Sequence, residues 1–298
     1  MSLYNICAIV TVYFPKEINV IYISELSKQV SSIIITDNTP NRDSAALFKN
    51  IDKSIYIPNK SNLGLSCSFN KCLKIEEVRL SDYILFMDQD SLIPDNLIKI
   101  LIDDYNWLKK NGYNVGCIGP IYYEKNAKKI MISRFKKKLK KNIYSVKTVI
   151  TSSMLTSYKN LEKIGFWNEN IFLDLADWDL CWRFIKSKFI CCMTGNAILT
   201  HSLGKSVKKI GLIHVKEGTA IREYYQTRDC LKLLFKPYTP LKFRVCFILM
   251  ITIRPIIHVL FLSEKHLRLK YIILGICDFF KKKDGTFQGE CSYKGGFE

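Results

Sequence analysis

The chain has 298 residues, 48% of them hydrophobic, which excludes a disordered chain and suffices for one large domain with or without an appendage. Its 45 Lys and Arg outnumber its 27 Asp and Glu, and the net charge of +18 favours anionic partners such as nucleic acid, acidic lipid or a phosphate-bearing substrate. Charge alone does not choose among these partners.

The cysteines and the start of the chain indicate its compartment. The 11 cysteines are odd in number and show no paired Cys-x-x-Cys spacing of the kind that holds zinc. Most lie in apolar runs, so we expect buried, reduced thiols. The first five residues lack the charged start and long apolar core of a secretory signal. We therefore expect a cytoplasmic protein.

The first third of the chain alternates apolar, β-rich runs with segments of helical spacing, the pattern of a parallel sheet flanked by helices. Polar residues directly follow the second and fourth predicted strands. In open α/β sheets, ligands bind at such carboxyl ends. The predicted strands cover residues 6–13, 32–36, 55–58 and 83–87, and the predicted helices cover residues 17–30 and 65–73.

The middle of the chain, residues 116–158, contains further strand-like runs. A stretch rich in Lys and Arg over residues 134–141 interrupts them. We expect this stretch to be a solvated loop or hairpin, and contact with anionic lipid is the alternative.

The composition changes at residue 231. Residues 243–262 are strongly apolar, but Arg254, Pro255 and His258 interrupt them and basic residues flank them. Because a spanning helix should hold about 20 apolar residues with few charges, we favour helices that lie in the membrane interface. A buried helical hairpin without membrane contact is the alternative.

The triplet Asp88-Gln89-Asp90 supplies two carboxylates at the end of a buried strand. A divalent cation needs this arrangement when phosphates complete its oxygen shell. Such a triplet occurs by chance in a chain of this length, so its position at a strand end matters more than its letters. A solvated strand end is the alternative interpretation.

Two earlier segments offer contacts to a nucleotide. Asp37 ends the second strand and could accept a hydrogen bond from the imide N–H of uracil or thymine, although Asp also caps turns. In the segment Asn62-Leu63-Gly64 the glycine admits close backbone approach, and the following helix presents its N-terminus to a diphosphate. A plain turn before a helix is the alternative.

These segments occur in an order that resembles the family 2 glycosyltransferases, over about residues 6–230. The resemblance rests on Val10-Thr11-Val12-Tyr13, Thr36-Asp37-Asn38, Asn62-x-Gly64-x5-Asn70, Phe86-Met87-Asp88-Gln89-Asp90-Ser91, Gly165-Phe166-Trp167-Asn168-Glu169 and Phe172-Leu173-Asp174-x2-Asp177-Trp178-Asp179-Leu180-x2-Arg183.

The resemblance implies an α/β fold of the GT-A type, a Rossmann-like fold for transferases of nucleotide-diphospho-sugars, with a C-terminal helical, membrane-associating extension. Residues 1–230 would form the catalytic domain, with a nucleotide-sugar half to about residue 115 and an acceptor half over residues 116–230. Residues 231–298 would form the helical region.

The resemblance also implies roles for individual residues. Asp177 would be the catalytic base of an inverting transfer, and Asp90 with His201 would hold Mg²⁺ or Mn²⁺. The residues implied for the acceptor, or for bracing its loop, are Asp174, Trp178, Asp179 and Arg183. The residues implied for the nucleotide sugar are Thr11, Tyr13, Asp37, Asn62, Gly64, Asn70, Asp88 and Gln89.

Within the family, the triplet region, His201-Ser202-Leu203-Gly204 and Arg222-x-Tyr224-Tyr225-x2-Arg228-Asp229 are similar to the rhamnosyltransferase-like branch. That branch implies dTDP-rhamnose as donor, a lipid-linked oligosaccharide as acceptor, a role in capsule or O-antigen synthesis, and peripheral attachment to the inner face of the cell membrane. This chain departs from the branch at two positions. It has Ser153 where the branch usually has Gly, and Asp229 where the branch usually has Asn. UDP-linked galactose, glucose or N-acetylglucosamine are therefore alternative donors.

Two other classes of protein stay open at this point. The charge and the 12% aromatic content suit a nucleic-acid-binding protein, although no binding module is recognisable and the acidic clusters would repel phosphate without a metal. A non-catalytic membrane scaffold that kept the fold and lost turnover is the second. The sequence leaves the oligomeric state open.

Overall fold

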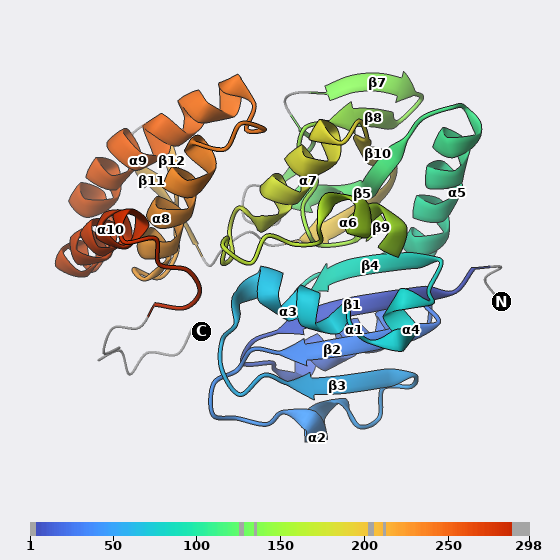
Figure 1. The fold of residues 1–298 in the computed structure, drawn as a ribbon. Coiled ribbons are helices and arrows are strands. Elements are labelled where there is room, and N and C mark those ends of the chain that lie inside the picture. The colour runs from blue at the N-terminus through green and yellow to red at the C-terminus, as the bar shows by residue number, and fades with distance from the viewer. Residues whose placement is uncertain (1–3, 125–127, 134–135, 202–205, 211–212, 288–298) are drawn as a thin grey trace.

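A computed structural model describes residues 4–124, 128–133, 136–201, 206–210 and 213–287 (Figure 1). One mixed sheet forms its centre, in the order β3-β2-β1-β4-β9-β5-β10-β8-β7, and β6 pairs with β5. The first four strands run parallel and match the prediction closely. They are β1 (Ile6–Val12), β2 (Ser32–Asp37), β3 (Ser54–Pro58) and β4 (Tyr83–Asp88).

The second half of the sheet joins β4 through a short antiparallel strand, β9. Beyond β9, strands β5 and β10 run parallel to each other, and a hairpin of two shorter strands closes the edge. The bounds are β5 (Val115–Glu124), β6 (Lys129–Met131), β7 (Lys136–Lys140), β8 (Ile143–Val146), β9 (Met154–Thr156) and β10 (Ile190–His201). The described part of the basic stretch is thus the exposed edge of a hairpin, as expected.

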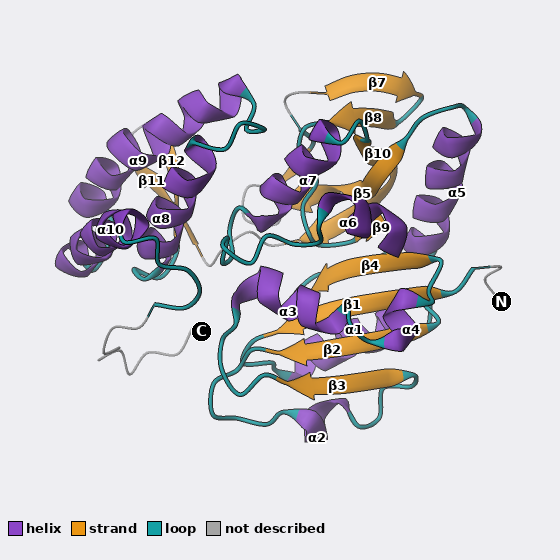
Figure 2. Ribbon diagram, in the orientation of Figure 1, coloured by secondary structure: helices purple, strands orange, loops and turns teal. Residues whose placement is uncertain are grey.

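Helices cover both faces of the sheet (Figure 2), because the strands alternate buried residues between two cores. In β1, Cys7 and Ile9 enter one core, and Ala8 and Val10 enter the other. The first core is covered by α3 (Gly64–Cys72), α6 (Tyr158–Ile164) and α7 (Ala176–Lys186). The second is covered by α1 (Glu17–Ser27) and α5 (Leu97–Lys110), and α2 (Ala45–Phe48) and α4 (Glu76–Arg79) are single turns.

Three helices and a hairpin form a unit beside the sheet (Figure 1): α8 (Arg222–Leu234), α9 (Leu241–Phe261), α10 (Lys265–Phe280), β11 (Ser206–Ile210) and β12 (Ile213–Glu217). The boundary predicted at residue 230 falls inside α8. The unit joins the sheet's core where Trp182 of α7 packs on Phe243 and Phe247 of α9, with ring centroids 4.9 and 5.8 Å apart.

Helix α9 is continuous through Arg254, Pro255 and His258, which interrupt the apolar run but not the helix. These residues lie one turn apart or less and therefore share one face. That face meets α8, where buried Glu223 accepts hydrogen bonds from Arg254 and Arg268 and pairs with His258 Nδ1 at 2.7 Å. The residues that break the apolar pattern thus attach the helix to its neighbours.

Phe243 and Phe247 bury a second stripe of α9, but most of its other side chains are exposed, so α9 is not a fully buried helix. The helix has 21 residues with a mean hydropathy of 1.9, and 22% of its apolar window is buried. By length and composition it could cross a membrane. Exposed apolar side chains follow a helical spacing along it and continue on α10: Val245, Ile248, Leu249, Ile253, Ile256, Leu260, Leu269, Ile273, Ile276 and Phe280.

Candidate active site

The carboxyl ends of β1, β2 and β4 lie in one row. Thr11 of β1 is the register partner of Asp88 in β4, and Val12 is the partner of Asp37 in β2. The Thr11 hydroxyl is buried and has no hydrogen-bond partner within the described residues. Parallel strands therefore bring the predicted edge of the site together, as the sequence pattern indicated.

Asp88 is held by a residue from the acceptor half. Ser152 Oγ donates a hydrogen bond of 2.5 Å to Asp88 Oδ2, and the next residue, Ser153, adopts a left-handed conformation (φ 66°). The loop between β8 and β9 therefore fixes the orientation of the Asp88 carboxylate. The sequence marked Ser152 only as part of a departure from the related branch, because nothing in the spacing predicts a partner 64 residues away.

Gln89 holds two strand ends together. Its Oε1 accepts a hydrogen bond from the Tyr13 backbone N–H at 2.8 Å, and its Nε2 donates to the Tyr13 carbonyl oxygen at 3.0 Å. The Asn19 amide in turn donates to the Gln89 carbonyl oxygen. Both ends of the Gln89 amide thus position the segment after β1, and the Tyr13 ring packs edge-on against Phe14.

The segment after Asp90 lies beside the end of β10. An isolated antiparallel bridge joins Leu92 to Thr200, one residue before His201. Asp90 is exposed, and the backbone of His201 ends β10. The side chain of His201 lies outside the described residues. The two predicted metal ligands therefore come from neighbouring backbone segments.

Asp177 lies in the first turn of α7 and is partly buried. Burial, then the nearby thiol of Cys181 and the carboxylates of Asp88 and Asp174, raise the pKa of Asp177 well above its usual range, against a lowering hydrogen bond from the Trp178 N–H. Asp177 in turn contributes, after burial, to raising the pKa of Tyr122 to about 12. Asp88 and Asp177, 89 residues apart, are thus close enough to interact electrostatically.

Asp174 is paired with α8. It accepts hydrogen bonds from Arg222, through both Nε and Nη2, and from Gln226 Nε2 at 2.6 Å. Burial opposes ionisation, but the charge and hydrogen bonds of Arg222, with the bond from Gln226, outweigh it and lower the pKa of Asp174. The pKa of Asp174 is therefore lowered and the pKa of Asp177 is raised, because Asp174 lies beside a cation and Asp177 lies near other acids.

Asp179, Arg183 and Trp178, predicted to contact the acceptor or to brace its loop, make bracing contacts. Asp179 is fully buried, and Arg183 Nε donates to it at 2.7 Å. The Arg183 guanidinium also donates to the carbonyl oxygens of Ile164 and Phe166. The Trp178 ring packs edge-on against Phe243 at 5.2 Å. These contacts fix α7 against the turn before it.

The predicted donor residues before β4 also bond within the protein. Asn62 Oδ1 accepts from the Gly64 N–H at 3.0 Å, and Asn70 donates to the Trp167 carbonyl oxygen and to Glu169. Asp37 has an exposed fraction of 1% and accepts from the Thr39 N–H and the Tyr56 hydroxyl. Asn62 therefore shapes the turn before α3, Asn70 joins α3 to the loop over residues 165–175, and the Asp37 carboxylate is covered.

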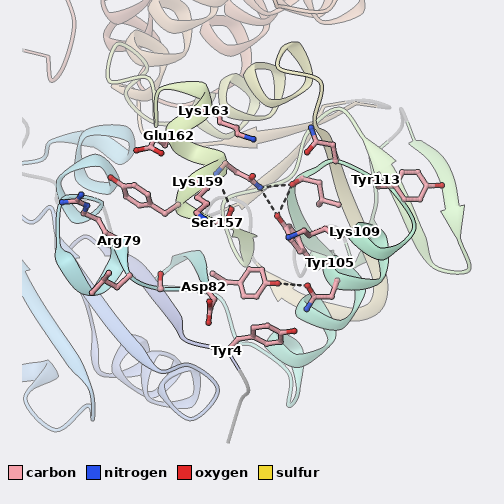
Figure 3. A pocket seen from close by; sticks show the side chains of 18 of the residues that line it. Tyr4, Arg79, Asp82, Tyr105, Lys109, Tyr113, Ser157, Lys159, Glu162 and Lys163 are labelled. Carbon is pink, nitrogen blue, oxygen red and sulfur yellow. Dashed lines mark hydrogen bonds between the residues drawn. The ribbon is translucent and has the colours of Figure 1, made fainter.

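A groove of about 1370 Å³ lies at the opposite end of the strands (Figure 3). It begins at Tyr83 and Val115, the first residues of β4 and β5. None of the strand-end aspartates lines it, so its size does not make it the candidate active site.

The fold and the acidic strand ends indicate the class of protein, and comparison with known proteins leads to the same class. Residues 18–165 match the model of the family described as Glycosyl transferase family 2. These residues form a domain of this family, and the chain has the GT-A fold and is a glycosyltransferase, as the sequence motifs predicted.

Among individual proteins, the chain is similar to the dTDP-rhamnosyl transferase RfbF of Shigella flexneri. The two are 25% identical over 249 residues, which cover 80% of this chain and 82% of that protein. The solved structure of GalNAc-T7 with UDP, GalNAc and Mn²⁺ shares the fold, with a TM-score of 0.56 at 11% identity over 82% of this chain. This chain spans about half, 54%, of that one.

Proposed function

We propose that this glycosyltransferase transfers rhamnose from dTDP-rhamnose, with inversion, to a lipid-linked oligosaccharide in cell-surface polysaccharide synthesis. The similarity to a dTDP-rhamnosyl transferase over four fifths of the chain supports the donor. The observation that carries the chemistry is the convergence of Asp88 and Asp177, one from each half of the domain, at the carboxyl edge of the sheet.

Asp177 is the proposed base. Inversion in one displacement needs a group that takes the acceptor's hydroxyl proton as its oxygen attacks the anomeric carbon opposite the leaving diphosphate. A carboxylate surrounded by acids has an increased proton affinity, which suits this step. Arg222 and Gln226 hold Asp174 and thereby position the loop that begins α7.

Asp88 and Asp90 are the proposed contacts to the donor and its metal. Their carboxylate oxygens suit a hard divalent cation, and the mutual repulsion of Asp88, Asp174 and Asp177 would be relieved by one. Mg²⁺ or Mn²⁺, with His201 as a further ligand, would neutralise charge that accumulates on the departing diphosphate. Thr11 lies at the end of β1 and Tyr13 directly follows that strand, at the same edge of the sheet. The remaining nucleotide-sugar contacts are assigned to these two residues.

The exposed apolar face of α9 and α10 is the proposed membrane contact. Its residues are largely solvent-exposed, and exposed Lys265, Lys270 and Lys281–Lys283 lie beside it on the same unit. Apolar side chains with a basic rim suit an anionic lipid surface. Peripheral attachment at the cytoplasmic face would place α7, which carries Asp177 and packs on α9 through Trp178, near a lipid-linked acceptor.

A binding panel tests the donor and the metal together. Calorimetry or thermal shift would compare dTDP-rhamnose, UDP-galactose, UDP-glucose, UDP-N-acetylglucosamine and GDP-mannose, each with Mn²⁺ and with a chelator. We expect the tightest binding for dTDP-rhamnose with Mn²⁺ and weak binding with the chelator. Tighter binding of a UDP-hexose would make that sugar nucleotide the proposed donor in place of dTDP-rhamnose. Binding that the chelator leaves unchanged would remove the metal from the proposal.

A further inference from the structure

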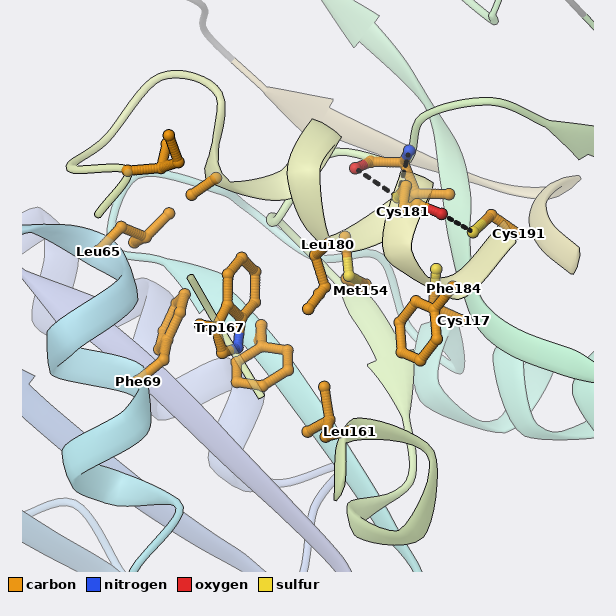
Figure 4. Close-up of a cluster of buried hydrophobic side chains, with 14 of the residues drawn as sticks. Leu65, Phe69, Cys117, Met154, Leu161, Trp167, Leu180, Cys181, Phe184 and Cys191 are labelled. Carbon is orange, nitrogen blue, oxygen red and sulfur yellow. Dashed lines mark hydrogen bonds between the residues drawn. The ribbon is translucent and has the colours of Figure 1, made fainter. Parts of the chain in front are cut away.

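Three cysteines converge in the core behind the acceptor half of the site (Figure 4). Cys117 of β5, Cys181 of α7 and Cys191 of β10 bring their sulfur atoms within 4.8 Å of one another. All three side chains are fully buried, and all are free thiols. No disulfide or catalytic role assigned above uses them.

The sheet register brings these cysteines together. Cys117 and Cys191 are register partners in neighbouring parallel strands, so their side chains leave the same face of the sheet. Helix α7 covers that face and adds Cys181 from above. The next residue of β10, Cys192, points into the opposite core. The cluster therefore needs three elements in register and could not be found from Cys-x-x-Cys spacing.

The surroundings of the sulfur atoms favour a thiolate at Cys181. The Val149 N–H donates a hydrogen bond to Cys181 Sγ at 3.3 Å, and Cys191 Sγ donates to the Cys181 carbonyl oxygen at 3.5 Å. Burial raises the pKa of Cys181, but hydrogen bonds from the other two thiols and from Val149 outweigh it and lower that pKa. An N–H donor to sulfur also stabilises a metal-bound thiolate.

We propose that Cys117, Cys181 and Cys191 form a three-sulfur site for a soft, thiophilic cation such as Cu⁺. Sulfur ligands select soft cations over Mg²⁺ and Mn²⁺, so this site and the acidic edge would take different metals. On binding, the S–H bonds of Cys117 and Cys191 break and their two protons leave to solvent, and three metal–sulfur bonds form, one of them to the Cys181 thiolate. Three ligands rather than four distinguish the cluster from an ordinary structural zinc site.

Occupancy of this site has a consequence for the transferase, and this consequence, unlike the site, rests on the proposed function. Cys181 lies one helical turn after Asp177 on α7 and contributes to the raised pKa of that base. Its hydrogen-bond partner Val149 lies in the loop that carries Ser152, which holds Asp88. A metal bound here would alter both carboxylates and lower the rate of transfer.

The test measures metal binding directly, with Cd²⁺ as a soft probe. The background is the full chain in which Cys67, Cys246, Cys277 and Cys291, outside the cluster, are changed to Ser. It is refolded from denaturant with Cd²⁺ and excess Mg²⁺, because the site is buried and filling during folding avoids an entry barrier. After desalting, bound cadmium is counted and the ultraviolet sulfur-to-cadmium absorption is recorded.

We expect roughly one Cd²⁺ per chain, with the absorption of thiolate ligation, and at least a tenfold loss of affinity in Cys181→Ser and in Cys117→Ala. Cys192→Ser, a buried neighbour on the other face, should bind as the background does. If Cys181→Ser does not fold, Cys117→Ala decides. Unchanged binding in the cluster variants, an equal loss in Cys192→Ser, or no cadmium in the folded background would overturn the proposal.

Discussion

Asp177 has a carboxyl group whose charged form is disfavoured by its surroundings. Burial, Cys181, Asp88 and Asp174 all raise its pKa, and the single Trp178 N–H does not compensate. Such a group costs stability when it is ionised and is retained where a function needs it. Asp174, three residues earlier, has the opposite balance because Arg222 lies beside it.

The raised pKa gives a pH-dependent prediction. A carboxyl whose folded pKa lies above its unfolded value stabilises the fold fully below the unfolded pKa, and this stability is lost as pH rises through the folded pKa. The Asp177→Asn variant has no carboxyl group to ionise at this position, so it does not lose this stability as the pH rises. We expect the Tm of the variant to exceed that of the wild type by a margin that grows as the pH rises above the unfolded pKa of Asp, about 4. A margin that shrinks with pH would contradict the raised pKa.

Asp179 forms a buried ion pair with Arg183. It is fully buried between Arg183, Tyr238 and Asn168, so Asp179→Ala would leave the Arg183 charge without its partner. We expect a loss of about 3–5 kcal/mol in urea unfolding. The exposed pair of Glu25 and Lys28 is the control, and Glu25→Ala should cost less than about 1 kcal/mol. Similar costs at the two sites would remove the bracing role of Asp179.

Single residues were predictable from the sequence where a strand end fixes them. Asp88 and Asp90 follow an apolar strand, and the parallel register places them at the expected edge. The roles of Gln89 and Asn70 were not predictable, since their partners Tyr13 and Trp167 are 76 and 97 residues away. Short-range spacing carries no information about such contacts.

At the scale of elements, the start of α3 depends on one glycine. Gly64 has φ +76°, and a Cβ there would lie 2.6 Å from the Phe172 carbonyl oxygen. That oxygen accepts a hydrogen bond from the Leu65 N–H, so the helix N-terminus is occupied by the acceptor loop. The sequence predicted close backbone approach at Gly64, and the partner in the described structure is Phe172.

Gly64→Ala should therefore destabilise the protein through both strain and steric clash. Gly112 is a matched control, because it has φ +79° and no heavy atom within 4 Å of its Cβ position. We expect Gly112→Ala to cost about 1–2 kcal/mol and Gly64→Ala to cost at least about 1 kcal/mol more, measured by urea unfolding. Equal costs would show that the loop yields without penalty.

The apolar face of α9 makes a prediction about membrane binding. Ile248 and Ile256 have exposed fractions of 48% and 60%. Replacing both with Glu should reduce affinity for phosphatidylglycerol vesicles by at least about tenfold, because two buried apolar contacts are lost and two repelled charges are added. Ile21→Glu, at a 54% exposed position on α1, is the control. Undiminished binding would assign membrane contact elsewhere, such as to β7.

The elements of the first half were predictable because buried parallel strands give continuous apolar runs with sharp polar ends. The attachment of helix α9 was not, because the sequence showed Arg254 and His258 only as interruptions of an apolar run. Those side chains face α8 and pair with Glu223, which no local pattern indicates. Tertiary pairing thus decides which face of the helix meets α8.

At the scale of the molecule, the two halves of the catalytic domain meet through the loop over residues 165–175. Asn70 of α3 holds Trp167, Leu65 bonds to Phe172, and Asp229 of α8 accepts a hydrogen bond from the Phe172 N–H at 2.9 Å. The Phe172 and Tyr225 rings stack at 4.1 Å. The loop that leads to Asp177 is therefore fixed from both the donor side and the helical unit.

This arrangement explains why the order of the motifs predicted the family and the fold, while the sequence did not show how the site is held. The motifs lie at strand ends, in turns and at the starts of helices that the fold brings together. The supporting contacts of Ser152, Arg222 and Gln226 come from side chains whose direction only the packed structure determines.

In the proposed mechanism, one group of strand-end acids binds the donor while Asp177 faces the acceptor. The most direct measurement compares donor affinity and transfer rate in Asp177→Asn, using the sugar nucleotide selected by the binding panel. We predict a dissociation constant within about threefold of wild type and transfer reduced at least about a hundredfold. Transfer at the wild-type rate, or a loss of donor binding as large as the loss of transfer, would contradict it.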